Sequence, residues 1–327
     1  MPPQPSASAE ARSGVVRIGT RASKLALAQS GHMQARIAAA LGAAPQDTDL
    51  AAPMTRITTS GDRIQDRRLL EAGGKGLFVK ELEEALLEGR IDCAVHSMKD
   101  MPAELPPGLV IAAIPEREDP RDVFIGFACD RLGDLPPGAR LGTASLRRQA
   151  QSLHRRPDLD IVMTRGNVDT RLGKLERGEV DGILLALAGL RRLGLQDRAG
   201  QPIDPVAAPP APGQGALAIQ TRGEDAGAPW LAALRDPATT LAVAAERGAL
   251  LALEASCRTA VGAYARIEAD QLLLTVEALS PDGALRLRRQ DQLGVPASQA
   301  PEALAHELGL RLGAQIREEA GDRILFG

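Results

Sequence analysis

Aromatic residues are nearly absent from this chain of 327 residues, making up 2% of the sequence with one Trp, one Tyr and four Phe. The hydrophobic cores must therefore be built from Leu, Ile, Val and Ala. The shortage argues against recognition of nucleic-acid bases, which relies on aromatic stacking platforms. The formal net charge of -3 points the same way, because a nucleic-acid surface is strongly basic.

Cysteine is also scarce, and Cys93, Cys129 and Cys257 are scattered without the CxxC spacing of a metal site. This usage predicts a reduced, cytoplasmic setting and no zinc centre. No apolar run is long enough to span a membrane. Residues 1–14 are rich in Pro, Ser and Ala and lack an apolar segment, which predicts a disordered leader rather than a signal peptide. We expect neither nucleic acid nor membrane as a partner.

Short apolar strands alternate with helices over the first two thirds of the chain, a pattern that predicts α/β architecture. Strands are expected over 15–20, 54–59, 91–97 and 109–114, with helices over 22–41 and 77–87. A second unit is expected to have strands over 123–126, 140–143, 160–164 and 182–187, with helices over 145–155 and 168–176. We expect the first unit to be a parallel sheet with its helices.

Two Pro-containing segments, 115–120 and 205–212, flank the second unit, and a strand over 216–221 can return the chain to the first. Two such crossings predict a hinged, two-lobed cleft. The pattern then changes to a helix over 239–253, strands over 261–268, 272–279 and 285–290, and a closing helix through Leu304 and Ile316, which indicates a small α+β domain. The expected domains are 15–117 with 212–235, then 118–211, then 236–327.

Arginines gather at turns and helix starts of the second unit, although the chain as a whole is slightly acidic. The nine are Arg147, Arg148, Arg155, Arg156, Arg165, Arg171, Arg177, Arg191 and Arg192. Ser145 is a natural N-cap, and two cations directly after it oppose the helix dipole unless an anion binds there. Because ligands collect at the carboxyl ends of strands, these arginines can converge on a carboxylate or a phosphate.

Part of this pattern has a plain alternative, since 34 Arg against 5 Lys is a bias of the whole chain. On that interpretation many of the nine are solvated surface charges. We assign Arg155, Arg156, Arg177 and Arg191 to this class.

Asp100 follows the strand over 91–97 and enters a loop that Pro102 prevents from continuing as a helix. A carboxylate at such a strand end can stabilise a cationic intermediate or exchange a proton with it. The alternative is a loop hydrogen bond or an ion pair with Lys99. His96 is expected to be a satisfied strand-end histidine, because no second histidine or acidic cluster accompanies it.

Three further sites each carry a functional and a structural interpretation. The glycine-rich segment 73–78 precedes a helix and suits either an anion cradle or a mobile lid, although it lacks P-loop spacing. Ser23 is expected to cap the first helix, with Arg21 facing the cleft or, alternatively, lying at the surface. Cys257, beside Arg258, is either an activated thiol or a small buried side chain, and Cys93 is expected in the core.

Seven segments in this order resemble one family closely, that of porphobilinogen deaminase, also called hydroxymethylbilane synthase. They are IGTRAS at 18–23, GGKGLFVKELE at 73–83, VHSMKD at 95–100, GTASLRRQ at 142–149, RGNVDTR at 165–171, AGLRRLG at 188–194 and PGQGA at 212–216. Each segment alone is a weak signal for the family, but the order and spacing of all seven together are highly specific. The resemblance covers nearly the whole chain after the leader.

The resemblance implies two domains built like type II periplasmic binding proteins, a third α+β domain and a covalent dipyrromethane cofactor. Cys257 matches the cysteine that holds this cofactor by a thioether, although the family's Glu-Gly-Gly-Cys is replaced here by Glu254-Ala255-Ser256-Cys257 and its Val-Pro by Thr259-Ala260. The implied enzyme is a monomeric transferase. It joins four porphobilinogen molecules stepwise to the cofactor and releases linear hydroxymethylbilane by hydrolysis.

The same match implies a role for individual residues. Asp100 takes the catalytic position, beside a cationic intermediate. Cofactor carboxylates are assigned to Lys99, Ser145, Arg147, Arg148 and Arg171. Substrate and the elongating polypyrrole are assigned to Arg21, Ser23, Arg165 and Arg192, with Lys75 and Phe78 in a lid loop. The competing hypothesis is a non-catalytic, two-lobed anion-binding protein.

Overall fold

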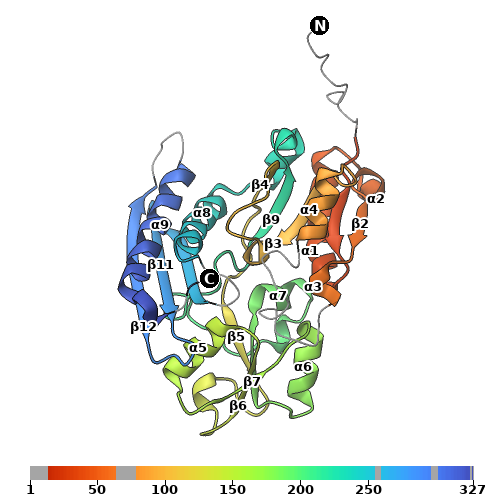
Figure 1. Ribbon diagram of the computed structural model, residues 1–327. Coiled ribbons are helices and arrows are strands. Elements are labelled where there is room, and N and C mark those ends of the chain that lie inside the picture. Colours follow the sequence, from red (N-terminus) through yellow and green to blue (C-terminus); the bar gives the residue numbers. More distant parts are fainter. Residues whose placement is uncertain (1–13, 64–78, 255–258, 296–300, 325, 327) are drawn as a thin grey trace.

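The computed structural model describes residues 14–63, 79–254, 259–295, 301–324 and 326. Their strands form three separate sheets (Figure 1). In that view the first sheet and its helices lie at the right, the second at the bottom and the third at the left. Within these residues, no helix is both long and apolar enough to cross a membrane.

The first sheet has the strand order β2 (Met54–Ile57), β1 (Ile18–Arg21), β3 (Cys93–Ser97), β9 (Leu217–Arg222) and β4 (Leu109–Ala113). Helices α1 (Lys24–Ala40), α2 (Thr48–Ala51), α3 (Ser60–Arg63) and α4 (Lys80–Leu87) belong to this unit. β1 is parallel to β2 and β3, whereas β9 is antiparallel to both β3 and β4. The expectation of a purely parallel sheet is therefore wrong, because β9 enters from a distant part of the chain.

The second sheet has the order β5 (Asp122–Gly126), β8 (Gly182–Ala186), β6 (Arg140–Thr143) and β7 (Asp160–Met163). Helices α5 (Leu146–Arg155), α6 (Val168–Glu176) and α7 (Leu187–Arg192) follow its parallel strands. β5 is antiparallel to β8. Each sheet thus contains one antiparallel strand that directly follows a crossing segment. In the first sheet β9 lies between β3 and β4, and in the second β5 lies at the edge beside β8.

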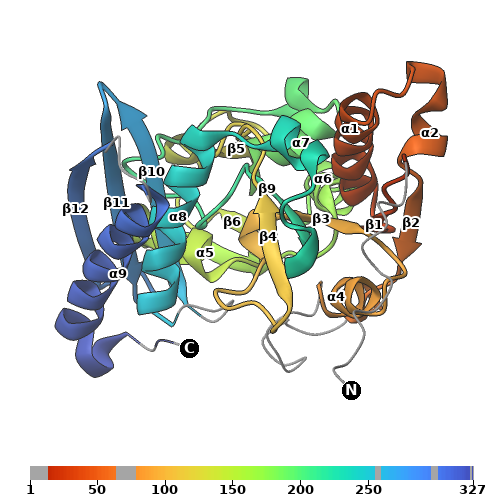
Figure 2. The same ribbon diagram turned by 90° about the horizontal axis from the view of Figure 1, so that it is seen from above.

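The third sheet is an antiparallel meander of β10 (Ala260–Glu268), β11 (Gln271–Leu279) and β12 (Arg286–Gly294). Helices α8 (Pro237–Ala252) and α9 (Pro301–Ala320) cover it, as Figure 2 shows. Glycines let these helices touch, since a Cβ on Gly248 would lie 2.1 Å from the carbonyl oxygen of His306. Together with the two α/β units this confirms the predicted fold class.

Short 3-10 turns complete the described elements. They are Pro45–Asp47, Met98–Asp100, Leu132–Asp134, Gln196–Arg198, Gly223–Asp225, Pro229–Leu234 and Gly321–Arg323.

Two segments of the chain cross between the first and second units, and we call them the crossing segments. A buried ion pair connects both of them to the third unit. Arg117 donates from Nη1 to Oε1 of Glu246 on α8 at 2.7 Å, and from Nε to the carbonyl oxygen of Gln214 at 2.9 Å. Glu246 also accepts from the backbone nitrogens of Gly213 and Ala265. The two segments between the lobes therefore share one carboxylate with β10 and α8.

Candidate active site

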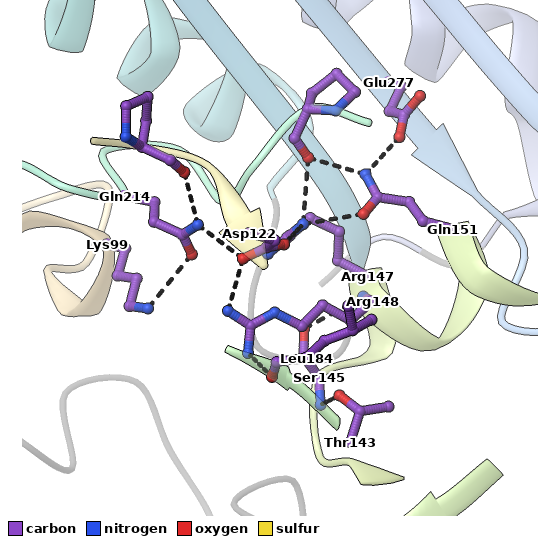
Figure 3. A network of polar contacts seen from close by, with 12 residues as sticks. Lys99, Asp122, Thr143, Ser145, Arg147, Arg148, Gln151, Leu184, Gln214 and Glu277 are labelled. Atoms are coloured by element: carbon purple, nitrogen blue, oxygen red, sulfur yellow. Dashed lines mark hydrogen bonds and ion pairs between the residues drawn. The ribbon is translucent and has the colours of Figure 1, made fainter. Parts of the chain in front are cut away.

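The buried carboxylate of Asp122 lies close to residues of all three units (Figure 3). It is the first residue of β5, next to a crossing segment. Its Oδ2 accepts from Nη1 of Arg147 at 2.8 Å, and its Oδ1 accepts from Nη2 of Arg148 at 2.7 Å. Nε2 of Gln214, on the other crossing segment, donates to Oδ1 at 2.8 Å. One anion therefore orders two guanidinium groups on the first turn of α5.

Charge around Asp122 is unbalanced in favour of cations. Burial acts to raise the pKa of Asp122, but the charges of Arg147 and Arg148 hold it well below its ordinary value. Burial also lowers the pKa of Arg147, with Asp122 opposing that shift. Nε of Arg147 and Nε of Arg148 are buried and have no hydrogen-bond partner among the described residues. These donors and the surplus positive charge suit a carboxylate ligand.

Lys99 and Asp100 lie on the 3-10 turn that follows β3. Nζ of Lys99 is 3.4 Å from Oε1 of Gln214. Lys99 and Asp100 are both exposed to solvent. Neighbouring protein atoms nevertheless displace much of the water around the Lys99 side chain. Loss of hydration there, followed by repulsion from Arg148, lowers the pKa of Lys99 to about 8. No ion pair joins Lys99 and Asp100, and no hydrogen bond or ion pair to another described residue involves the Asp100 carboxylate.

Helix starts in the second unit bring the next arginines to this site. Oγ of Ser145 caps α5 by accepting from the backbone nitrogen of Arg148 at 3.4 Å, as predicted. Arg171, on α6, donates from Nε to the carbonyl oxygen of Gly166 at 2.9 Å. Burial, then repulsion from Arg148 and Arg165, lowers the pKa of Arg171 to about 10. Nη1 of Arg165 is buried with no partner among the described residues.

The first unit contributes its own helix start. Oγ of Ser23 caps α1 by accepting from the backbone nitrogen of Ala26 at 3.3 Å, and half-buried Arg21 ends β1. Nζ of Lys24 lies 2.6 Å from Oδ2 of Asp169, which joins the starts of α1 and α6.

Arg192 ends α7 and donates from Nη2 to the carbonyl oxygen of Gly215 at 2.6 Å. Burial lowers the pKa of Arg192, with Glu118 opposing that shift. Arg192 therefore contacts the second crossing segment.

Of the four arginines expected at the surface, three form ion pairs with nearby carboxylates. Arg155 is exposed, Arg156 pairs with Asp158 at 2.7 Å, and Arg177 pairs with Glu179 at 2.7 Å. Arg191 pairs with Glu118, also at 2.7 Å.

His96 and Cys93 occupy the predicted buried positions. Nε2 of His96 is 2.9 Å from Oε1 of Gln220, and burial lowers the pKa of this histidine to about 4. Cys93 is fully buried in β3. In the described part of the chain, no group of three His, Cys, Asp or Glu residues could hold a metal ion.

Three predicted residues, Cys257, Lys75 and Phe78, lie outside the described residues. Conversely, sequence reasoning did not find Asp122 or Gln214 as partners of the arginines. Both sit in or beside Pro-containing segments far from α5 in the chain, so no local pattern could reveal that they meet it.

The fold and this site define a class: a two-lobed α/β protein with a cationic site between its units, extended by an α+β domain. A family model described as "Porphobilinogen deaminase, dipyromethane cofactor binding domain" matches residues 16–228. A second, "Porphobilinogen deaminase, C-terminal domain", matches 240–318. The chain belongs to the porphobilinogen deaminase family.

Relatives of high similarity carry the same name. The porphobilinogen deaminase of Caulobacter vibrioides strain NA1000 is 66% identical over 95% of this chain and 98% of its own length. That of Caulobacter sp. strain K31 is 67% identical with the same coverage. Among solved structures, the sulphonate-binding protein SsuA of Escherichia coli is 14% identical with a TM-score of 0.34, covering 72% of this chain and 70% of its own.

These matches bear out the predicted activity. The chain is a transferase of porphyrin biosynthesis, a hydroxymethylbilane synthase with a dipyrromethane cofactor. It joins four porphobilinogen molecules stepwise to that cofactor and releases the linear product by hydrolysis. The non-catalytic alternative is not favoured, because the matched relatives are enzymes over nearly their full length.

Proposed function

We propose that the site around Asp122 divides the work of this reaction between fixed and moving carboxylates. Lys99, Ser145, Arg147, Arg148 and Arg171 hold the carboxylates of the cofactor, which is attached to Cys257. Arg21, Ser23, Arg165 and Arg192 hold porphobilinogen and the growing chain, and Lys75 and Phe78 belong to a covering loop.

One observation carries this assignment: Arg147 and Arg148 pair with the buried carboxylate of Asp122, and Lys99 and Arg171 both lie close enough to Arg148 to be repelled by it. Burial lowers the pKa of both Lys99 and Arg171, and repulsion from Arg148 lowers both further. The three cations therefore lie close enough to repel one another. Carboxylates bound beside them relieve the repulsion and accept from the two unpartnered Nε atoms. The described residues therefore fit the cofactor.

Asp100 is the proposed catalytic carboxylate. When bound, the dipyrromethane group supplies the free α-carbon of a terminal pyrrole as the acceptor for substrate. Asp100 sits at a strand end with no competing partner among the described residues, so its oxygens can accept a proton from a pyrrole nitrogen and stabilise nearby positive charge. The ammonium group of the neighbouring Lys99 supplies a further positive charge close to Asp100.

The proposal extends to the organisation of the protein. We take the domains as 15–117 with 212–235, 118–211 and 236–327, and membership of the three sheets supports this division. We also propose that the enzyme works as a monomer in the cytoplasm on porphobilinogen and the elongating polypyrrole.

The covalent attachment is tested by replacing Cys257 with Ser. Because only a thiolate is expected to hold the cofactor, denatured wild-type protein should be heavier than its sequence by two pyrrole units, whereas Cys257→Ser should match its sequence mass. Cys129→Ser is the matched control and should keep the surplus. An unmodified wild-type chain with full activity would refute the assignment.

The catalytic role is tested with Asp100→Ala. Loss of a positioned proton-transfer group typically costs about 10²–10⁴ in rate, so turnover of porphobilinogen should fall by at least that factor. The melting temperature should stay close to that of the wild type, because Asp100 is exposed and its carboxylate forms no hydrogen bond or ion pair with another described residue. Near-normal turnover would remove Asp100 from this role.

A further inference from the structure

Behind Arg147, hydrogen bonds lead from the site into the third sheet (Figure 3). Nη1 of Arg147 donates to Oε1 of Gln151 at 2.9 Å, one turn further along α5. Nε2 of Gln151 donates to Oε1 of Glu277 on β11 at 2.6 Å. The other oxygen of Glu277 accepts from Nη2 of Arg286 on β12, also at 2.6 Å. The site thus connects to two strands of the third unit through buried polar groups.

The connection closes into a ring through the second crossing segment. Nη2 of Arg286 donates to the carbonyl oxygen of Ala207 at 2.9 Å. Two residues later, the carbonyl oxygen of Pro209 accepts from Nε2 of Gln151 at 2.8 Å and from Nη1 of Arg147 at 3.3 Å. We call Arg147, Gln151, Glu277, Arg286 and the 207–209 segment the Arg147 ring. Every link in it joins different elements of the fold except the turn of α5 itself.

The ring leaves its central side chains little freedom. The Gln151 amide must point its oxygen at a guanidinium and its nitrogen at a carboxylate and a carbonyl, so flipping it would oppose all three contacts. Glu277 is fully buried. The segment is also packed tightly, because a Cβ on Gly262 of β10 would lie 2.4 Å from the Pro209 oxygen. A shift of the third sheet must therefore move Arg147 or break the ring.

We propose that Gln151 and Glu277 are positioning residues for the transferase reaction. They fix the Arg147 guanidinium, and with it the pairing to Asp122, relative to the third unit that carries Cys257. This inference rests on the proposed function, in which Arg147 holds a cofactor carboxylate while Cys257 holds the same group covalently. Two attachments from different units need a set separation, and the Arg147 ring supplies it.

The competing explanation is that the Arg147 ring only holds two units together. α5 offers a matched control, since Gln149 also reaches the third unit, donating from Nε2 to the carbonyl oxygen of Pro281 at 3.1 Å. Among the described residues, the side chain of Gln149 forms no hydrogen bond with Arg147. Replacing each glutamine with Met therefore removes an inter-unit contact in both variants but removes a hydrogen bond to Arg147 in only one.

The experiment compares Gln151→Met, Gln149→Met and Glu277→Gln by steady-state kinetics, melting temperature and denatured mass. Misplacement of a reacting group by about 1 Å can cost 10²-fold in rate, so we expect kcat per loaded chain to fall about tenfold or more in Gln151→Met. The KM for porphobilinogen should stay within about twofold, because the proposed substrate residues lie outside the ring. The fraction of chains carrying the two-pyrrole mass should also fall.

Gln149→Met should match the wild type in kcat and in loaded fraction, and Glu277→Gln should change both in the direction of Gln151→Met. Equal kcat and loaded fraction in Gln151→Met and Gln149→Met would overturn the proposal, whatever their melting temperatures. If Gln151→Met does not unfold cooperatively, Glu277→Gln decides by the same comparison. Arg147→Lys distinguishes failure of this inference from failure of the proposed function on which it rests. Full activity in that variant would refute the proposed role of Arg147 itself.

Discussion

At the scale of single residues, Asp122 changes the meaning of the paired arginines on α5. The sequence suggested that Arg147 and Arg148 need an external anion because they follow a helix N-cap. The structure supplies an internal one, at 2.8 Å and 2.7 Å from the two guanidinium groups. A guanidinium carries five N–H donors, so pairing with Asp122 orders each group and still leaves donors for a ligand. Asp122 therefore orients both guanidinium groups, while the Nε donor of each keeps no partner among the described residues.

Lys99 provides a pH-dependent test of the same site. Its pKa of about 8 lies below the ordinary lysine value of 10.5, chiefly because burial disfavours the ammonium form. As the pH rises through 8, Lys99 loses the charge that attracts carboxylates. Between pH 8 and 10.5 the folded chain binds fewer protons here than the unfolded chain, so this residue's unfavourable effect on stability shrinks with rising pH.

We therefore expect acetylation of Lys99 in the cofactor-free Cys257→Ser chain to rise with a midpoint near pH 8. In the loaded wild-type enzyme the midpoint should move up, because bound carboxylates favour the ammonium form. Peptide mass spectrometry after brief labelling at a series of pH values measures both. Coinciding midpoints in the two proteins would contradict contact between Lys99 and the cofactor.

At the scale of elements, local pattern predicted most of the fold. The helix expected over 168–176 coincides with α6, and that expected over 145–155 differs from α5 by one residue. Capping explains this success, since Ser145 and Asn167 satisfy orphan backbone nitrogens at defined positions. Hydrophobic alternation predicted β10 and β11 to within one residue at each end, whereas β12 extends beyond the predicted end at 290 to Gly294.

Strand direction and distant partners could not be predicted in the same way. β5 and β9 read as ordinary apolar strands, and only the crossing of the chain between units makes them antiparallel to their neighbours. The candidate site shows the same division. The arginines and Lys99 were visible beside strand ends, whereas Gln214, Gln151 and Glu277 became partners through contacts over long sequence separations.

At the scale of the whole molecule, an exposed ion pair joins the lobes on the side of the proposed substrate residues. Lys24 begins α1 of the first unit and Asp169 lies in the first turn of α6 of the second, with Nζ and Oδ2 2.6 Å apart. If the lobes open about the two crossings, as the sequence predicts, this contact must break. Exposed pairs contribute about 0.2–1 kcal/mol, so it can bias an open–closed equilibrium by no more than about fivefold.

We predict that Lys24→Gln and Asp169→Asn shift this equilibrium equally, and that the double variant shifts it no further, because either change removes the whole contact. Energy transfer from Trp230, the only tryptophan, to a probe on half-buried Cys129 reports the separation of the two units. The difference from wild type should vanish in about 1 M salt, where the Debye length is about 3 Å.

Glu179→Gln is the matched control, because it removes an exposed ion pair with Arg177 that stays within the second unit. It should leave the energy transfer unchanged. Independent, additive effects of Lys24→Gln and Asp169→Asn would show that the two side chains act separately. In that case the contact across the lobes would not govern opening, and the attachment of both crossing segments to Glu246 would be the remaining restraint on the hinge.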